Sequence, residues 1–163
     1  MDIIECWLTK VKNADIGNDW QEPSLSQMLN DAPPELFGLI VSPYQYEAIA
    51  YWLTLCQRLS QIYQDTGRYD LTFHYMQFSY SKIQAITTAP QQDEAIRRWG
   101  VKKLELMVIG MVEFCRQQAL PIWLCESQQL VELHVHFMKQ LHHQNLSLGP
   151  VIRTSQGNDY GRD

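Results

Sequence analysis

Histidine and acidic side chains near the end of the chain have the types and spacing that could bind a metal ion. Glu132 and His136 are four residues apart, so they would share one face of a helix, and His143 follows on the same side. Such a trio could bind zinc, but no cysteine or second acidic cluster is placed to complete the site. The pair His142 and His143 also suits the last turn of a helix, where positive charge interacts favourably with the helix dipole. We therefore expect a solvated helix face and no bound metal.

Nucleophilic catalysis has equally little support in the sequence. Cys125 precedes Glu132 and His134, but a chain with four cysteines and five histidines offers such a combination by chance. The chain has no glycine-rich phosphate loop and no Gly-x-Ser-x-Gly motif. We expect no enzymatic activity, no catalytic residue and no cofactor.

Basic residues gather once in the chain, on both sides of Trp99. Arg97, Arg98, Lys102 and Lys103 could contact a nucleic acid or another anion through its phosphate groups. The formal net charge of the whole chain is -5, which disfavours nucleic acids and anionic membranes as partners. We expect this basic strip to be solvated surface, with nucleic-acid contact as the alternative.

Four cysteines bear on the cellular compartment: Cys6, Cys56, Cys115 and Cys125. No pair has Cys-x-x-Cys spacing and each has apolar neighbours, so buried free thiols in a reducing cytoplasm are expected. The first residues lack the basic and apolar runs of a secretory signal, and the apolar stretch 104–114 is too short to span a bilayer. We expect a soluble cytoplasmic protein.

The elements that must position these residues are predicted to be helices. Apolar residues recur at steps of three and four along most of the chain, as they do on one face of a helix. Ser42 and Pro43 mark a helix start, and Gly67 marks a helix end. Thr88 with Gln91 resembles a capping box for the next helix. The predicted helices cover residues 1–11, 24–30, 43–66, 71–86, 89–119 and 126–143.

We therefore predict an all-α fold: a single compact bundle of five or six helices with an antiparallel helical hairpin at its centre. Residues 1–148 would form this one domain, and residues 149–163 would form a polar, flexible C-terminal tail. Val108 and Met111 lie on a predicted helix that is apolar nearly all round, so we expect both in the core. We also expect this helix to be central and the most buried. Residues 130–138 also fit an alternating strand pattern, although the length of the segment favours a helix.

The hairpin around Gly67 carries the most specific pattern in the chain, and over residues 55–84 it resembles one tetratricopeptide repeat. The matching positions are the leucine, small residue and tyrosine of the first helix, the turn, and a small residue in the second: Leu59, Ser60, Tyr63, Gly67, Tyr69, Asp70 and Thr72. Proteins of similar length built from such repeats include the small acidic chaperones of bacterial type III secretion translocators. The resemblance implies a bacterial adaptor or chaperone that binds another protein.

Aromatic residues crowd the same hairpin, which holds seven of the eight tyrosines. Tyrosine is favoured at protein interfaces because it offers a large apolar area and one hydrogen-bonding group. Tyr44, Tyr51, Tyr69 and Tyr75 lie off the main apolar stripes, so we predict that they face a partner. The alternative is that they pack against neighbouring helices.

The sequence thus favours a non-enzymatic helical protein-binding module that uses the aromatic hairpin of residues 44–80. One alternative is a small acidic inhibitor, such as an immunity protein or an antitoxin, whose carboxylates would cover a basic active site. Its candidate residues are Asp65, Asp70, Asp93 and Glu94. Another alternative is a nucleic-acid-linked regulator that uses residues 97–103. A second copy of the chain is also compatible as a partner.

Overall fold

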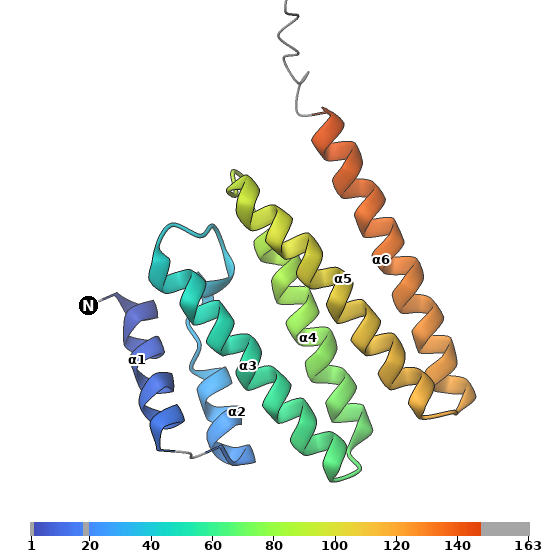
Figure 1. The fold of residues 1–163 in the computed structure, drawn as a ribbon, viewed down its shortest axis with the longest axis horizontal. Coiled ribbons are helices and arrows are strands. Elements are labelled where there is room, and N and C mark those ends of the chain that lie inside the picture. The colour runs from blue at the N-terminus through green and yellow to red at the C-terminus, as the bar shows by residue number, and fades with distance from the viewer. Residues whose placement is uncertain (1, 18–19, 148–163) are drawn as a thin grey trace, which may run out of the picture.

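The structure, a computed structural model, describes residues 2–17 and 20–147 (Figure 1). In these residues the secondary structure is six α-helices and one short 3-10 helix, with no strand. The helices are α1 (Ile3–Ile16), α2 (Glu22–Asn30), η1 (Pro34–Phe37), α3 (Pro43–Asp65), α4 (Tyr69–Thr87), α5 (Glu94–Gln117) and α6 (Pro121–Ser147). The predicted all-α bundle is confirmed, and residues 130–138 are helical. The predicted tail, residues 149–163, lies outside the described residues.

Consecutive helices pack side by side. α3, α4, α5 and α6 form a row in which each helix packs on its neighbour, while α1 and α2 pack on α3 (Figure 1). The α3–α4 hairpin therefore occupies the middle of the molecule, as predicted. α6 lies at the end of the row and packs chiefly on α5 (Figure 1).

Individual residues at the helix ends explain where three of the helices start or end. Ser42 accepts a hydrogen bond from the Gln45 amide at 3.3 Å, so it caps α3 as predicted. Gly67 ends the hairpin's first helix with a φ of 74°, a left-handed conformation that glycine adopts without strain. α6 starts at Pro121 rather than at residue 126. Proline suits the first turn of a helix because the N–H that it lacks would have no partner within the helix there.

The capping box predicted at Thr88 and Gln91 is wrong. Gln91 has a φ of 62°, so the chain is still in a turn at this point. Asp93 caps α5 instead, and its carboxylate accepts hydrogen bonds from the amides of Ala95 and Ile96 at 2.8 and 3.4 Å.

Two apolar clusters form the core. The larger one surrounds α3, which carries the most buried side chains of the described helices. The smaller one joins α4 to α5 and α6 and includes Val108 and Met111, both buried as predicted. The prediction that α5 is the most buried helix is wrong, because its Leu106 side chain is 65% exposed and Ile109 is exposed too.

The prediction that the cysteines are buried is confirmed for two of the four and wrong for the other two. Cys56 and Cys115 are buried, and burial raises the pKa of both thiols, which disfavours their reactive thiolate form. Cys6 and Cys125 are exposed, because both lie on helix faces that no neighbouring helix covers.

Candidate functional site

A groove runs between α4 and α6, with α5 as its floor. The two helices run in the same direction, since Phe73 lies beside Trp123 near the start of both helices and Tyr80 lies beside His134 further along. The groove holds two adjoining depressions of about 240 and 250 Å³, and Gln77 lines both. Asp70, Phe73, Ile122, Trp123 and Glu126 line the first depression. The second is lined by Tyr80, Ser81, Gln84, Val108, Met111, Leu130, Leu133 and His134.

Three aromatic rings hold the first depression in shape. Phe73 of α4 stacks on Phe114 of α5, with ring centroids 6.2 Å apart. Trp123 of α6 meets both rings edge-on, at centroid distances of 5.3 and 5.4 Å. Edge-to-face pairs of this kind are favourable because the positive edge of one ring meets the negative face of another. The cluster therefore fixes the position of the start of α6 against α4 and α5.

A polar contact closes the second depression. The Tyr80 hydroxyl and Nδ1 of His134 share a hydrogen bond of 2.8 Å between α4 and α6. Burial lowers the pKa of His134 and raises the pKa of Tyr80, so both groups favour their neutral forms. A neutral pair can keep this hydrogen bond with either group as the donor.

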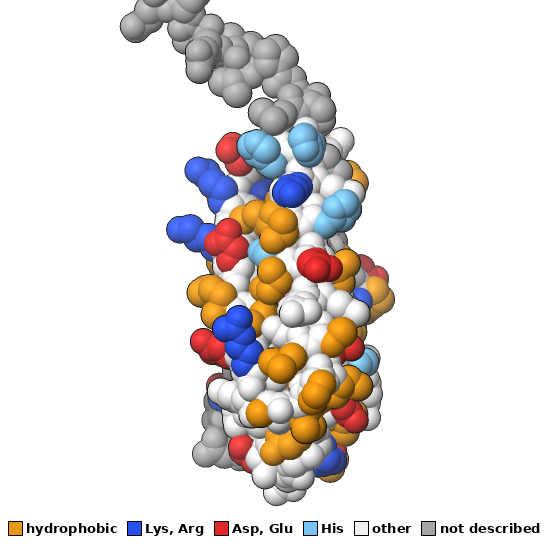
Figure 2. Space-filling model, turned by 90° about the vertical axis from the view of Figure 1, so that its right-hand side faces the viewer, with side chains coloured by type: hydrophobic (Ala, Val, Ile, Leu, Met, Phe, Trp, Pro, Cys, Tyr) orange, Lys and Arg blue, Asp and Glu red, His pale blue; other side chains and the backbone are white. Residues whose placement is uncertain are grey.

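Apolar side chains of α6 line the groove while still open to solvent. Ile122 and Leu133 are each 68% exposed. Figure 2 views the molecule from the α6 side and shows hydrophobic side chains spread over this face. Asp70 and Glu126 add negative charge at one end, and no lysine or arginine of the described part of the chain lines either depression. The groove thus has apolar side chains on its α6 wall and floor, a largely polar α4 wall and an acidic end.

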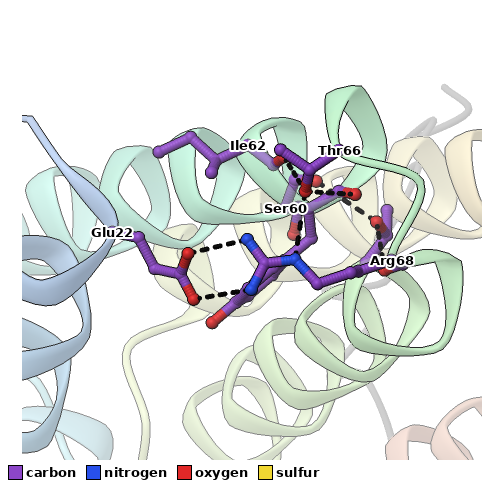
Figure 3. Close-up of polar contacts among 7 residues, drawn as sticks. Glu22, Ser60, Ile62, Thr66 and Arg68 are labelled. Carbon is purple, nitrogen blue, oxygen red and sulfur yellow. Dashed lines mark hydrogen bonds and ion pairs between the residues drawn. The ribbon is translucent and has the colours of Figure 1, made fainter.

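The turn of the predicted hairpin is well ordered by polar contacts (Figure 3). The Thr72 hydroxyl donates to the Ser60 carbonyl at 3.3 Å, across the two helices. Arg68 makes two hydrogen bonds to the Glu22 carboxylate, at 3.0 and 2.7 Å, and so joins the turn to α2. Its guanidinium also lies over the Tyr63 ring, 4.6 Å from the centroid. The residues of the tetratricopeptide-like pattern thus build the turn, and membership of that family stays a prediction.

The four tyrosines predicted to bind a partner do not form one surface. Tyr44 and Tyr51 lie two turns apart on α3, and Lys12 of α1 lies over the Tyr51 ring at 5.9 Å. Tyr69 lies at the start of α4, with its ring 6.3 Å from that of Phe114. Tyr75 faces α3 and stacks on a neighbouring ring there. Tyr44 and Tyr69 are exposed and the other two are half-buried, since α1 and α3 cover them.

The sequence prediction missed the α6 side of the groove. Trp123 fell outside the predicted helix because that helix was expected to begin at residue 126. Leu133 was grouped with the core stripe, yet it is one of the most exposed apolar residues. The signal was present in the sequence: apolar residues cover more of α6 than one packing neighbour can bury.

The basic strip is divided between two sides of α5. Arg97, Arg98 and Lys102 line a depression near the start of α5 and the end of α6. Lys103 lines a different depression that includes Gln57 of α3 and residues of α4. The helix turns through about 100° per residue, which directs Lys103 away from Lys102.

The carboxylates of the inhibitor alternative are also separated. Asp65 and Asp70 lie on either side of the α3–α4 turn, while Asp93 and Glu94 lie beyond the far end of α4. Among the described residues, no three histidine, cysteine or acidic side chains are placed to hold a metal ion. Glu132, His136 and His143 are exposed on α6. Within the same residues, no helix has the length and apolar character needed to cross a membrane.

Comparisons with protein-family models, with curated proteins and with solved structures find no match to this chain. The geometry of the described residues is therefore the basis for any functional conclusion.

Proposed function

We propose that this chain is a non-enzymatic protein-binding module whose α4–α6 groove takes an amphipathic helix from a partner protein. The observation that carries the proposal is the exposure of two apolar side chains of α6 that line the groove, Ile122 in the first depression and Leu133 in the second. Exposed apolar side chains that line one channel are typical of protein interaction sites. An amphipathic helix that lays its apolar face into such a groove is a recurring mode of recognition.

The shape and charge of the groove specify the partner segment further. The lining residues of α4 extend from Asp70 to Gln84. At 1.5 Å per residue this wall is about 21 Å long, which matches about four turns of a bound helix. Asp70 and Glu126 at one end favour a lysine or arginine on the partner. We therefore expect a partner helix with an apolar stripe and a basic residue at one end of it.

The groove contains groups suited to binding rather than to catalysis. Its titratable groups are two carboxylates at one end and the Tyr80 and His134 side chains, which are hydrogen-bonded to each other. None of the residues described as lining either depression is a cysteine. An adaptor or chaperone role in a bacterial cytoplasm, which the resemblance of the hairpin implies, is part of the same proposal.

The test compares two changes on opposite flanks of α6. Leu133→Glu places a charge in the groove, while Val135→Glu places the same charge on the exposed flank that faces away from it. Partners recovered from a lysate are identified by mass spectrometry, and hydrogen exchange of the purified complex locates the contact. We expect Leu133→Glu to lose the partner, Val135→Glu to keep it, and protection to fall on α4 and α6.

The predicted tyrosine surface is tested in the same experiment. Tyr44→Ala changes an exposed ring, so it should affect folding by no more than about 0.5 kcal/mol, whereas Tyr69→Ala also removes the contact with Phe114 and should cost more. If Tyr44→Ala loses the partner while Leu133→Glu keeps it, the α3 surface is the docking site and the groove proposal is wrong. Equal loss in Leu133→Glu and Val135→Glu would also contradict it, because the contact would then not be specific to the groove.

A further inference from the structure

A second hollow of the molecule has a different chemistry from the groove. It lies between the first turns of α5 and the last turns of α6, has a volume of about 640 Å³ and shares no lining residue with the groove. Arg97, Arg98 and Lys102 line it together with the apolar side chains of Val101 and Leu141. Its volume falls within the range of about 300–1,000 Å³ that is typical of small-molecule sites.

The positive charge of this hollow is not compensated by ion pairs among the described residues. Lys12, Arg58 and Arg68 each pair with a carboxylate elsewhere in the molecule. None of the three cations of the hollow does so, although Glu94 also lines it. The hollow thus gathers three positive charges and one negative charge in a chain with a net charge of -5.

Arg97 has a hydrogen-bonding group that its surroundings leave unused. Its side chain is half-buried, and one terminal nitrogen donates to the Ala89 carbonyl at the long distance of 3.5 Å. Its Nε is buried and has no acceptor among the residues that the structure describes. A buried donor without a partner is unfavourable, so this donor gains a partner if the Arg97 side chain turns toward a ligand oxygen in the hollow.

We propose that this hollow binds a small phosphorylated molecule of the nucleoside phosphate class. The guanidinium groups of Arg97 and Arg98 suit phosphate oxygens because each offers several N–H donors in a planar fork. Lys102 adds a third positive charge, and Val101 and Leu141 provide an apolar surface for a base. Glu94 can accept hydrogen bonds from sugar hydroxyls. The site goes beyond the proposed function because the groove takes no part in it.

The arrangement favours a small ligand over a nucleic acid. A polynucleotide needs a row of cations along its backbone, but Lys103 lies in another hollow and breaks the row. The negative net charge of the chain also opposes the approach of a long polyanion.

The experiment is a calorimetric titration of the full chain with ADP, with inorganic pyrophosphate and with a single-stranded oligonucleotide. Loss of one charged hydrogen bond weakens binding about tenfold or more, so we expect this loss for ADP in both Arg98→Gln and Lys102→Gln. Lys103→Gln is the matched control, with the same charge change on the same helix, and it should bind ADP as the unchanged chain does. Pyrophosphate should bind at least about tenfold more weakly than ADP, because it lacks the base that contacts Val101 and Leu141.

Three results would overturn the inference. The first is no binding of ADP at millimolar concentration by a chain whose circular dichroism shows it folded. The second is equal weakening by Lys103→Gln and Lys102→Gln, which would indicate a diffuse surface charge rather than a site. The third is tighter binding of the oligonucleotide than of ADP, with a loss in Lys103→Gln, which would indicate a nucleic-acid strip. Pyrophosphate that binds as tightly as ADP would overturn the nucleoside assignment.

Discussion

Replacement of glycine by alanine should have opposite effects on stability at two positions of α5. At Gly100 an added Cβ would overlap the hydroxyl oxygen of Thr87 and would lie only 3.0 Å from its Cβ. At Gly110 no atom lies within 4 Å of the position of the added Cβ. Replacing glycine by alanine in a helix gains about 1 kcal/mol when nothing else changes. We therefore expect Gly110→Ala to stabilise the fold by about that amount.

The cost at Gly100 follows from what Thr87 can do. Thr87 is fully buried, and its hydroxyl donates to the Ile83 carbonyl at 2.7 Å. Its branched side chain has few rotamers in a helix, and turning it away would lose a hydrogen bond worth about 1 kcal/mol. Overpacking of this kind costs about 1–3 kcal/mol. The lost hydrogen bond and the overpacking together cost about 2–4 kcal/mol. After subtraction of the gain of about 1 kcal/mol in helix propensity, Gly100→Ala should destabilise the fold by about 1–3 kcal/mol.

Urea unfolding followed by far-ultraviolet circular dichroism measures both variants. The two should differ by about 2–4 kcal/mol, which exceeds the error of the method. A double variant, Gly100→Ala with Thr87→Ala, removes the overlapping hydroxyl. In a double-mutant cycle it should lose less stability than the sum of the losses in the two single variants. If Gly100→Ala proves as stable as Gly110→Ala, the close approach of α4 and α5 at Thr87 is wrong.

Two further predictions concern the core and the groove. Met111 is 1% exposed, so Met111→Asp would bury an unpaired charge. This change should lower the free energy of unfolding by more than about 3 kcal/mol. An unchanged melting temperature would place Met111 on the surface. The pKa of His134 lies below its ordinary value near 6.5, so the unfolded chain binds a proton more readily and stability should fall as the pH drops through 6.5. Melting curves from pH 8 to 5 should show a shallower decline for His134→Gln, and an identical decline would show that His134 contributes nothing to it.

The helices were predictable because their signals are local. The periodicity of apolar residues and the residues at the helix ends, such as Ser42 and Gly67, lie within a few positions of the structure that they determine. The boundary errors have local causes too. The start of α6 at Pro121 was not predicted, although Pro43 begins α3 in the same way. α5 is capped by Asp93 rather than by Thr88, because the Asp93 carboxylate accepts hydrogen bonds from two free amides.

Burial was less predictable because it depends on how many neighbours a helix has. α3 is covered by α1, α2 and α4, whereas α5 has α4 and α6 on its two sides and solvent on a third. Leu106 and Ile109 lie on that third side, so an apolar composition did not make α5 the most buried helix. The count of neighbours is a property of the topology, and no short segment of sequence encodes it.

The candidate groove was unpredictable for the same reason. Its walls come from residues about fifty positions apart, such as Tyr80 and His134, and only the packing of α4 and α6 on a shared helix brings them together. The tyrosine hypothesis selected rings by their distance from the apolar stripe of one helix. It could not distinguish a ring that faces solvent, such as Tyr44, from one that faces another helix, such as Tyr75.

The position of α6 links the fold to the proposed function. Among the described residues, the Tyr80–His134 contact is the one side-chain hydrogen bond that joins α4 to α6. The rings of Phe73 and Trp123 fix the start of α6 against α4, whereas this single bond between neutral groups holds the walls further along the groove. An apolar helix that displaced this bond would bury the Tyr80 hydroxyl and the His134 ring without partners, at a cost of about 1–3 kcal/mol for each group. We therefore expect the proposed partner helix to cover Leu133 and to leave this bond in place.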